Sequence, residues 1–172
     1  MRAGNRAADG AAVFSVLGLM QPQSIEPIMD EQKKLALISR MGALQKYNGG
    51  VAPLAMPLVT LEEYFDGAEG EAGLLCNSPE QPDNDTILAA LQSVRKRPDV
   101  HDVRIAIVQC DDGEWPFSDK IVITTRASEE HVIGWLPSGF EPDETWEGDV
   151  DHLPAEQVEV PAGYRMLWLW YD

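Results

Sequence analysis

The segment that most constrains the fold is Tyr164–Tyr171, YRMLWLWY, near the end of the chain. Aromatic and aliphatic residues favour β-strands, and here they occupy both of the faces that alternate along a strand. A strand with one face in water alternates apolar and polar residues, whereas a strand covered on both sides is apolar throughout. The sequence therefore predicts a central strand over Tyr164–Tyr171, in a sheet whose two faces are both covered.

The segments before that strand alternate between strand and helix patterns. Apolar residues occupy every second position of two segments, which is the pattern of a half-buried strand. From Gly73 onward the predicted order is strand, helix, strand, strand, helix, strand, which is typical of the split βαβ, or ferredoxin-like, arrangement. We therefore predict an α+β fold of the order βαββαβ, with the segments Gly73–Asn77, a helix capped by Asp83 or Asn84, Asp102–Cys110, Lys120–Thr125, a helix capped by Ser128, and Tyr164–Tyr171.

An additional N-terminal helix is predicted over residues 30–46, with Asp30 as its N-cap. Val51–Leu58 holds two prolines and is predicted to be an extended connector. Residues 1–28 are rich in Ala, Gly and Arg and differ from the rest. We predict that residues 1–28 are a disordered leader or a mis-assigned start, and that residues 29–172 form a single α+β domain. A signal peptide and an ordered element are the alternatives for residues 1–28.

Charge limits the partners of this chain. From Gly49 to the end there are 25 acidic side chains and 7 basic ones. Such a surface repels nucleic acid and anionic membranes, and it attracts basic proteins or cations. No run of about 18 apolar residues is present that would span a bilayer. Cys76 and Cys110 are too few for a disulfide framework, and we expect both to be small buried residues in a reduced cytoplasm.

The chain carries no signature of catalysis. Its three histidines lack a Cys or His at the short spacing of zinc ligands, and its acidic stretches do not follow the spacing of a calcium loop. No nucleophile elbow, P-loop or dinucleotide fingerprint is present. We therefore predict no catalytic residue, no metal and no cofactor. The alternative is an enzyme of unknown reaction that uses carboxylates such as Asp119 or Asp143 as acid/base groups.

Two acidic loops each contain a tryptophan. A tryptophan within an acidic loop is unusual if the loop only keeps the protein dispersed, because tryptophan is enriched in interface hot spots. The alternative is that this acidity only maintains solubility. The predicted contacts for a partner are Asp111, Asp112, Glu114, Trp115, Glu141, Asp143, Glu144 and Trp146.

Several motifs of this chain resemble a family of small acidic bacterial proteins of unknown function. They are VTLEEYF at Val59–Phe65, GLLCN at Gly73–Asn77 and EWPFSD at Glu114–Asp119, followed by the Trp-rich strand. The resemblance covers about residues 55–172 and implies a bacterial, cytoplasmic protein. It brings no catalytic residues. By analogy, some small acidic bacterial proteins are immunity proteins that neutralise a basic toxin.

The sequence therefore predicts a non-enzymatic acidic binding protein that engages a basic protein partner, without nucleic acid or membrane as partners. Electrostatic attraction would steer the encounter and would weaken as salt is added. Besides the enzyme alternative, the chain could be a structural subunit of a homo-oligomer, which a large apolar patch on the sheet would indicate.

Overall fold

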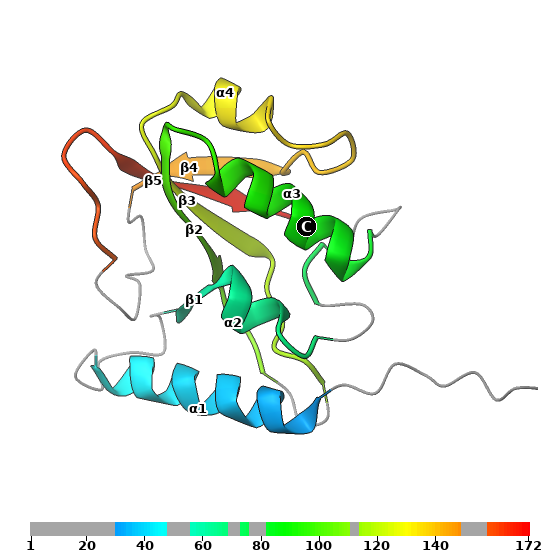
Figure 1. Ribbon diagram of the computed structural model, residues 1–172. Helices are drawn as coiled ribbons and strands as arrows, with labels where there is room; N and C mark the ends of the chain where they lie inside the picture. Colours follow the sequence, from blue (N-terminus) through cyan, green and yellow to red (C-terminus); the bar gives the residue numbers. More distant parts are fainter. Residues whose placement is uncertain (1–29, 48–55, 69–72, 76–81, 111–113, 149–157) are drawn as a thin grey trace, which may run out of the picture.

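The apolar segment near the end of the chain forms β5 (Arg165–Trp170), which lies inside a sheet. The computed structural model describes residues 30–47, 56–68, 73–75, 82–110, 114–148 and 158–172 (Figure 1). Within these residues a five-stranded sheet has the order β1-β2-β3-β5-β4. Leu167, Trp168 and Leu169 of β5 are at most 1% exposed, so both faces of this strand are covered. The prediction of a central, doubly covered strand is confirmed.

All four strand pairings of this sheet are antiparallel. Apolar residues at alternate positions of β2 and β3 face the same side, and Val103, Ile105, Ile121 and Ile123 are fully buried. The other elements of the described part are α1 (Glu31–Tyr47), β1 (Leu58–Thr60), α2 (Leu61–Phe65), α3 (Asn84–Arg95), β2 (Val100–Ala106), β3 (Lys120–Thr125), α4 (Glu129–Ile133) and β4 (Glu144–Glu147).

The α+β class predicted from the sequence is confirmed, but the ferredoxin-like order is not. A split βαβ unit places a further strand between two parallel ones, whereas β3 pairs directly with β5 in antiparallel register. The described part of the predicted first strand, Gly73–Leu75, is a bend in which Leu75 has a positive φ of 61°. Among the described residues, no strand lies between β3 and β5, where the predicted first strand would have been placed. Strand β1 instead pairs with the edge of β2 that faces away from β3.

Strand β1 begins at Leu58, the last residue of the connector predicted over Val51–Leu58. Pro57 is the second proline of this connector, and its carbonyl accepts a hydrogen bond from the amide of Ile107 at 2.9 Å. Proline is tolerated on an edge strand because the edge does not need every donor. The pairing of Leu58–Thr60 with β2 therefore coexists with the prolines that had indicated a connector.

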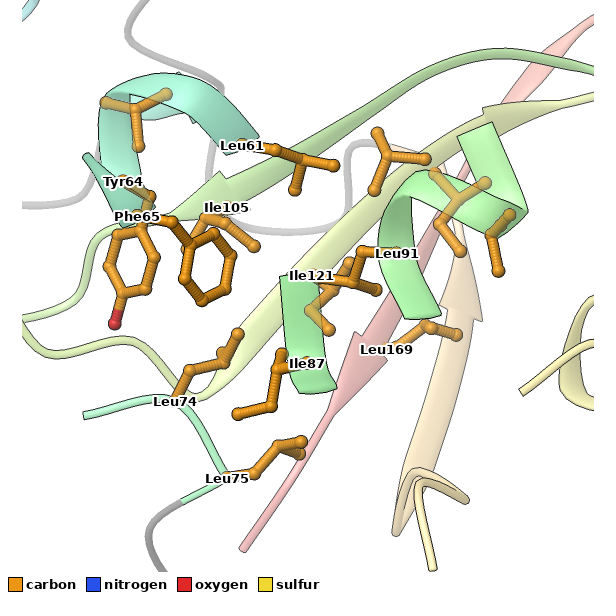
Figure 2. Close-up of a cluster of buried hydrophobic side chains, with 14 of the residues drawn as sticks. Leu61, Tyr64, Phe65, Leu74, Leu75, Ile87, Leu91, Ile105, Ile121 and Leu169 are labelled. Carbon is orange, nitrogen blue, oxygen red and sulfur yellow. The ribbon is translucent and has the colours of Figure 1, made fainter. Parts of the chain in front are cut away.

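Three helices cover one face of the sheet. Buried side chains of α2, α3 and α4 form a single cluster with the inward-facing residues of β2, β3 and β5. Figure 2 shows the part of this cluster in which α2 and α3 meet the strands, with the side chains of Leu61, Tyr64, Phe65, Ile87, Leu91, Ile105, Ile121 and Leu169. We call this the helix-side cluster.

Local side-chain bonds fix where these helices begin. Thr60 and Glu63 form a capping box at α2, each side chain bonding the backbone N–H of the other residue. Asp83, one of the two residues predicted for that position, caps α3, and Ser128 caps α4 as predicted. The opposite face of the sheet carries a smaller cluster, formed by Leu58, Ala106, Val122, Met166 and Trp168.

Helix α1 lies beside α2 (Figure 1). Leu37 and Met41 of α1 belong to the helix-side cluster. Lys33 pairs with Asp66 at 2.6 Å, and Arg40 pairs with Glu63 at 3.1 Å. No helix in the described ranges is long and apolar enough to cross a bilayer. The predicted leader, residues 1–28, lies outside the described residues.

The two cysteines were expected to be buried. Cys110 is instead exposed, and it lies beyond β2, which ends at Ala106. Cys76 lies outside the described residues.

Candidate binding surface at the acidic end of the sheet

One end of the sheet gathers carboxylates from segments far apart in sequence. At this end β3 begins, β5 ends and β4 begins, because Lys120 pairs with Trp170 and Trp170 with Glu144. The loop before β4 is tied to the same place, since the amide of Asp143 donates to the carbonyl of Trp170 at 2.9 Å. We call this region the acidic end, and it consists of Asp119, Glu141, Asp143, Glu144 and Asp172.

Four of these carboxylates, Glu141, Asp143, Glu144 and Asp172, have no basic side chain as partner among the described residues. Glu141 accepts a hydrogen bond from the amide of Gly139 at 2.8 Å. Asp143 accepts one from the amide of Asp172, also at 2.8 Å. Glu144 has no ion-pair partner within the described part of the chain. Many other carboxylates in that part, including Asp119 of the acidic end, are paired with Lys or Arg, namely Asp30, Glu62, Glu63, Asp66, Asp99, Asp102, Asp119 and Glu147.

Tyr171 experiences the field of these carboxylates. Its side chain is buried, and its hydroxyl donates to the carbonyl of Phe140 at 3.3 Å. Burial is the largest cause of a strongly raised pKa of Tyr171, and the negative charges of Asp143 and Glu141 raise this pKa further. Asp143 and Glu141 are therefore both close enough to Tyr171 to affect its hydroxyl at the acidic end.

Asp119 has a structural role at this end. One of its carboxylate oxygens pairs with the Lys120 ammonium at 2.6 Å, and the other accepts a hydrogen bond from the indole N–H of Trp170 at 2.8 Å. Its backbone carbonyl accepts from the amide of Tyr171. Asp119 thus joins the start of β3 to the end of β5, with both carboxylate oxygens engaged.

The sequence placed Trp146 in a long acidic loop, but the structure places it in β4. Its ring stacks on that of Trp168, with centroids 5.9 Å apart and planes 9° apart. Trp146 is half-buried against the smaller cluster. It lies in the same short strand as Glu144, and the two side chains share a face of the sheet because strand residues alternate.

Trp115 lies elsewhere. Its indole N–H donates to the carbonyl of Tyr64 at 3.0 Å, and its half-buried ring packs against the helix-side cluster. The structure therefore places Trp115 and Trp146 on clusters at opposite faces of the sheet. Glu114 is exposed beside Trp115, while Asp111 and Asp112 lie outside the described residues.

The structure thus brings together Glu141, Asp143, Glu144 and Trp146, half of the residues predicted as partner contacts. The sequence interpretation missed Asp172, whose position beside Asp143 depends on the pairing of β4 with β5. Its one local signal was a charged residue directly after an apolar strand. In the described ranges, no three His, Cys, Asp or Glu side chains are grouped as metal ligands.

These features define a small α+β protein with a half-buried tryptophan and exposed carboxylates at one end of an antiparallel sheet. The chain belongs to the Uncharacterized protein YfbO family, whose model matches residues 32–169. It is similar to the "Uncharacterized protein YfbO" of Escherichia coli (strain K12), with 33% identity over 137 residues that cover 78% of this chain and 98% of that protein. No solved structure matches the chain. The predicted membership of an uncharacterised bacterial family is confirmed.

Proposed function

We propose that this protein is a non-enzymatic binding protein of the bacterial cytoplasm and that it engages a basic protein partner. One observation supports the proposal most. The exposed carboxylates of Glu141, Asp143 and Glu144 lie together without a basic partner among the described residues, in a protein that pairs many of its other acids.

Electrostatic attraction acts mainly on the encounter of the two proteins. A patch of like charges raises the local concentration of an oppositely charged partner and accelerates association. Lys or Arg side chains of the partner would supply the charges that Glu141, Asp143 and Glu144 lack. Exposed charges are screened over about 8 Å at physiological ionic strength, so the association rate falls as salt rises.

Trp146 supplies an apolar contact beside this charge. Its ring is half-buried and stacks on the ring of Trp168. Interfaces combine an aromatic anchor with a charged rim, and Trp146 and Glu144 are arranged in this way on one strand. We retain Glu114 and Trp115, together with Asp111 and Asp112, as a separate part of the proposed contact surface.

The proposal is tested by capture from a lysate of the native organism on the immobilised protein, followed by elution with rising salt. We expect a basic protein that is retained at low salt and released at high salt. The triple variant Glu141→Gln, Asp143→Asn, Glu144→Gln removes the unpaired charges and is expected to lose that protein.

A control variant removes the same charge elsewhere. Glu31, Asp85 and Glu130 are exposed and lie on three different helices, without ion-pair partners in the described part of the chain. Their replacement by Gln, Asn and Gln is expected to leave capture intact. If both triple variants lose the partner equally, total charge rather than the acidic end is responsible, and recovery of only neutral or acidic proteins would refute the proposal.

A further inference from the structure

The end of the sheet opposite the acidic end holds a cavity of about 680 Å³ that is open to solvent. There β2 begins at Val100, β3 ends at Thr125 and β5 begins at Arg165. A cavity of this size is within the range of small-molecule sites. Its lining comes from the turn after α3, the turn after β3 and the end of α4, and includes Arg97, Asp99, Arg126, Ser128, His131 and Trp135.

Arg97 is an unusual cation in this molecule. From Gly49 onward, five of the seven basic side chains form ion pairs with carboxylates, namely Arg95, Arg104, Lys120, Arg126 and Arg165. The Arg97 guanidinium has no such partner among the described residues. It lies 5.1 Å from the centroid of the Trp135 ring, which holds it by a cation–π contact.

Arg126 is the second guanidinium of the cavity. Its Nε donates to Asp99 at 2.6 Å, and its guanidinium carbon lies 5.7 Å from the ring centroid of Tyr164. Asp99 is the one carboxylate in the described lining of the cavity, and it is engaged by this bond. Two arginines face one engaged aspartate, so the cavity carries net positive charge within a protein of net charge −16.

Hydrogen-bond donors of other kinds line the same cavity. The Ser128 hydroxyl lies 3.0 Å from Nδ1 of His131, and both side chains are exposed to the cavity.

A guanidinium presents its N–H groups as a rigid fork that matches the oxygens of a phosphate group. The contacts with Trp135 and Tyr164 hold the two guanidinium groups in place before a ligand arrives, which lowers the entropy lost on binding.

We propose that this cavity is a binding site for the phosphate group of a small molecule, held by Arg97 and Arg126. A lone carboxylate has fewer acceptor oxygens and one charge, whereas a phosphate has three strong acceptors and nearly two charges. The site shares no residue with the acidic end. Its test is therefore independent of the proposed protein partner.

The test is an NMR titration of the full chain with inorganic phosphate, which follows the indole N–H of Trp135 and the arginine Nε–H signals. Physiological ionic strength is used, where a Debye length of about 8 Å screens the distant carboxylates. We expect saturable shifts at Trp135, and weaker effects from acetate. Glycerol phosphate is a second probe, and tighter binding than that of inorganic phosphate identifies a phosphate ester as the ligand.

Arg97→Gln is the decisive variant because it breaks no ion pair of the described structure. It is expected to weaken phosphate binding about tenfold, the effect of losing one charge-assisted hydrogen bond. Arg126→Gln is expected to act similarly. Lys96→Gln is the control, since Lys96 is an exposed neighbour that does not line the cavity. Equal binding to wild type and Arg97→Gln, equal shifts with acetate, or no saturable shift would overturn the proposal.

Discussion

The hydroxyl of Ser118 is buried at the point where the chain enters β3. It donates to the carbonyl of Ala106 at 2.7 Å and accepts from the amide of Lys120 at 3.1 Å. Ser118→Ala leaves both groups without this partner, and we expect the free energy of unfolding to fall by about 1–3 kcal/mol. Urea unfolding measures the change.

The matched control for this residue is Ser138→Ala, because Ser138 is exposed. Substitutions at such sites change stability by less than about 0.5 kcal/mol. Equal losses in the two variants would show that the Ser118 hydroxyl does not stabilise the start of β3.

Single residues also show which features the sequence could predict. Asp83 and Ser128 were identified as helix caps because a cap bonds an amide only three residues along the chain. The place of Trp146 could not be predicted in this way. Its neighbours are acidic, so β4 lacks an apolar pattern, and pairing with a strand some 20 residues later determines its structure.

Helices α2 and α3 are joined by an ion pair between Glu62 and Arg95, with one Nη–O distance of 2.9 Å. The hydrogen bond from Arg95 is the main cause that lowers the pKa of Glu62 below its usual 4.5. The stabilisation is therefore present above pH 4.5 and is lost as the pH falls through the lower pKa of the folded state.

We expect Glu62→Gln to lower the free energy of unfolding by about 0.2–1 kcal/mol at neutral pH, the usual range for an exposed ion pair. The difference from wild type should shrink as the pH falls well below 4.5. Urea unfolding at neutral and acidic pH measures both quantities. Glu159→Gln is the control, because Glu159 is exposed and has no ion pair within the described residues, and it should show no such pH dependence.

At the scale of elements, local alternation predicted β2 and β3, and a run of residues apolar on both faces predicted β5. The three strands lie near the expected residues. The order of the strands was not predictable in the same way. The segment Gly73–Leu75 is as apolar as a strand, yet it packs as a bend whose Gly73 carbonyl accepts from the amide of Ser118 at 3.4 Å. Whether this segment forms a strand or a bend depends on tertiary contacts, which a short apolar run does not encode.

For the whole molecule, we expect added NaCl to stabilise the folded state at neutral pH. The chain carries a net charge of −16, and the self-repulsion of that charge destabilises the compact form. The exposed ion pairs, which salt also weakens, contribute little each. Thermal unfolding should therefore show a Tm that rises by about 2–4 °C for each 1 kcal/mol of repulsion removed.

The same measurement near pH 4.4, the isoelectric point of the sequence, provides the control. Repulsion is absent there, so salt should leave Tm unchanged or lower it slightly. A Tm that falls with salt at neutral pH would show that the ion pairs outweigh the repulsion.

The two edge strands, β1 and β4, are the shortest strands of the sheet. β1 has three residues, and β4 has four, with Glu144 and Glu147 at its two ends. Short edge strands, and an exposed charge such as that of Glu144 on β4, hinder backbone hydrogen bonding between the sheet edges of two copies. At high concentration, copies of the protein are therefore hindered from forming a continuous intermolecular sheet. A partner at β4 must be bound through side chains and cannot add a strand to the edge.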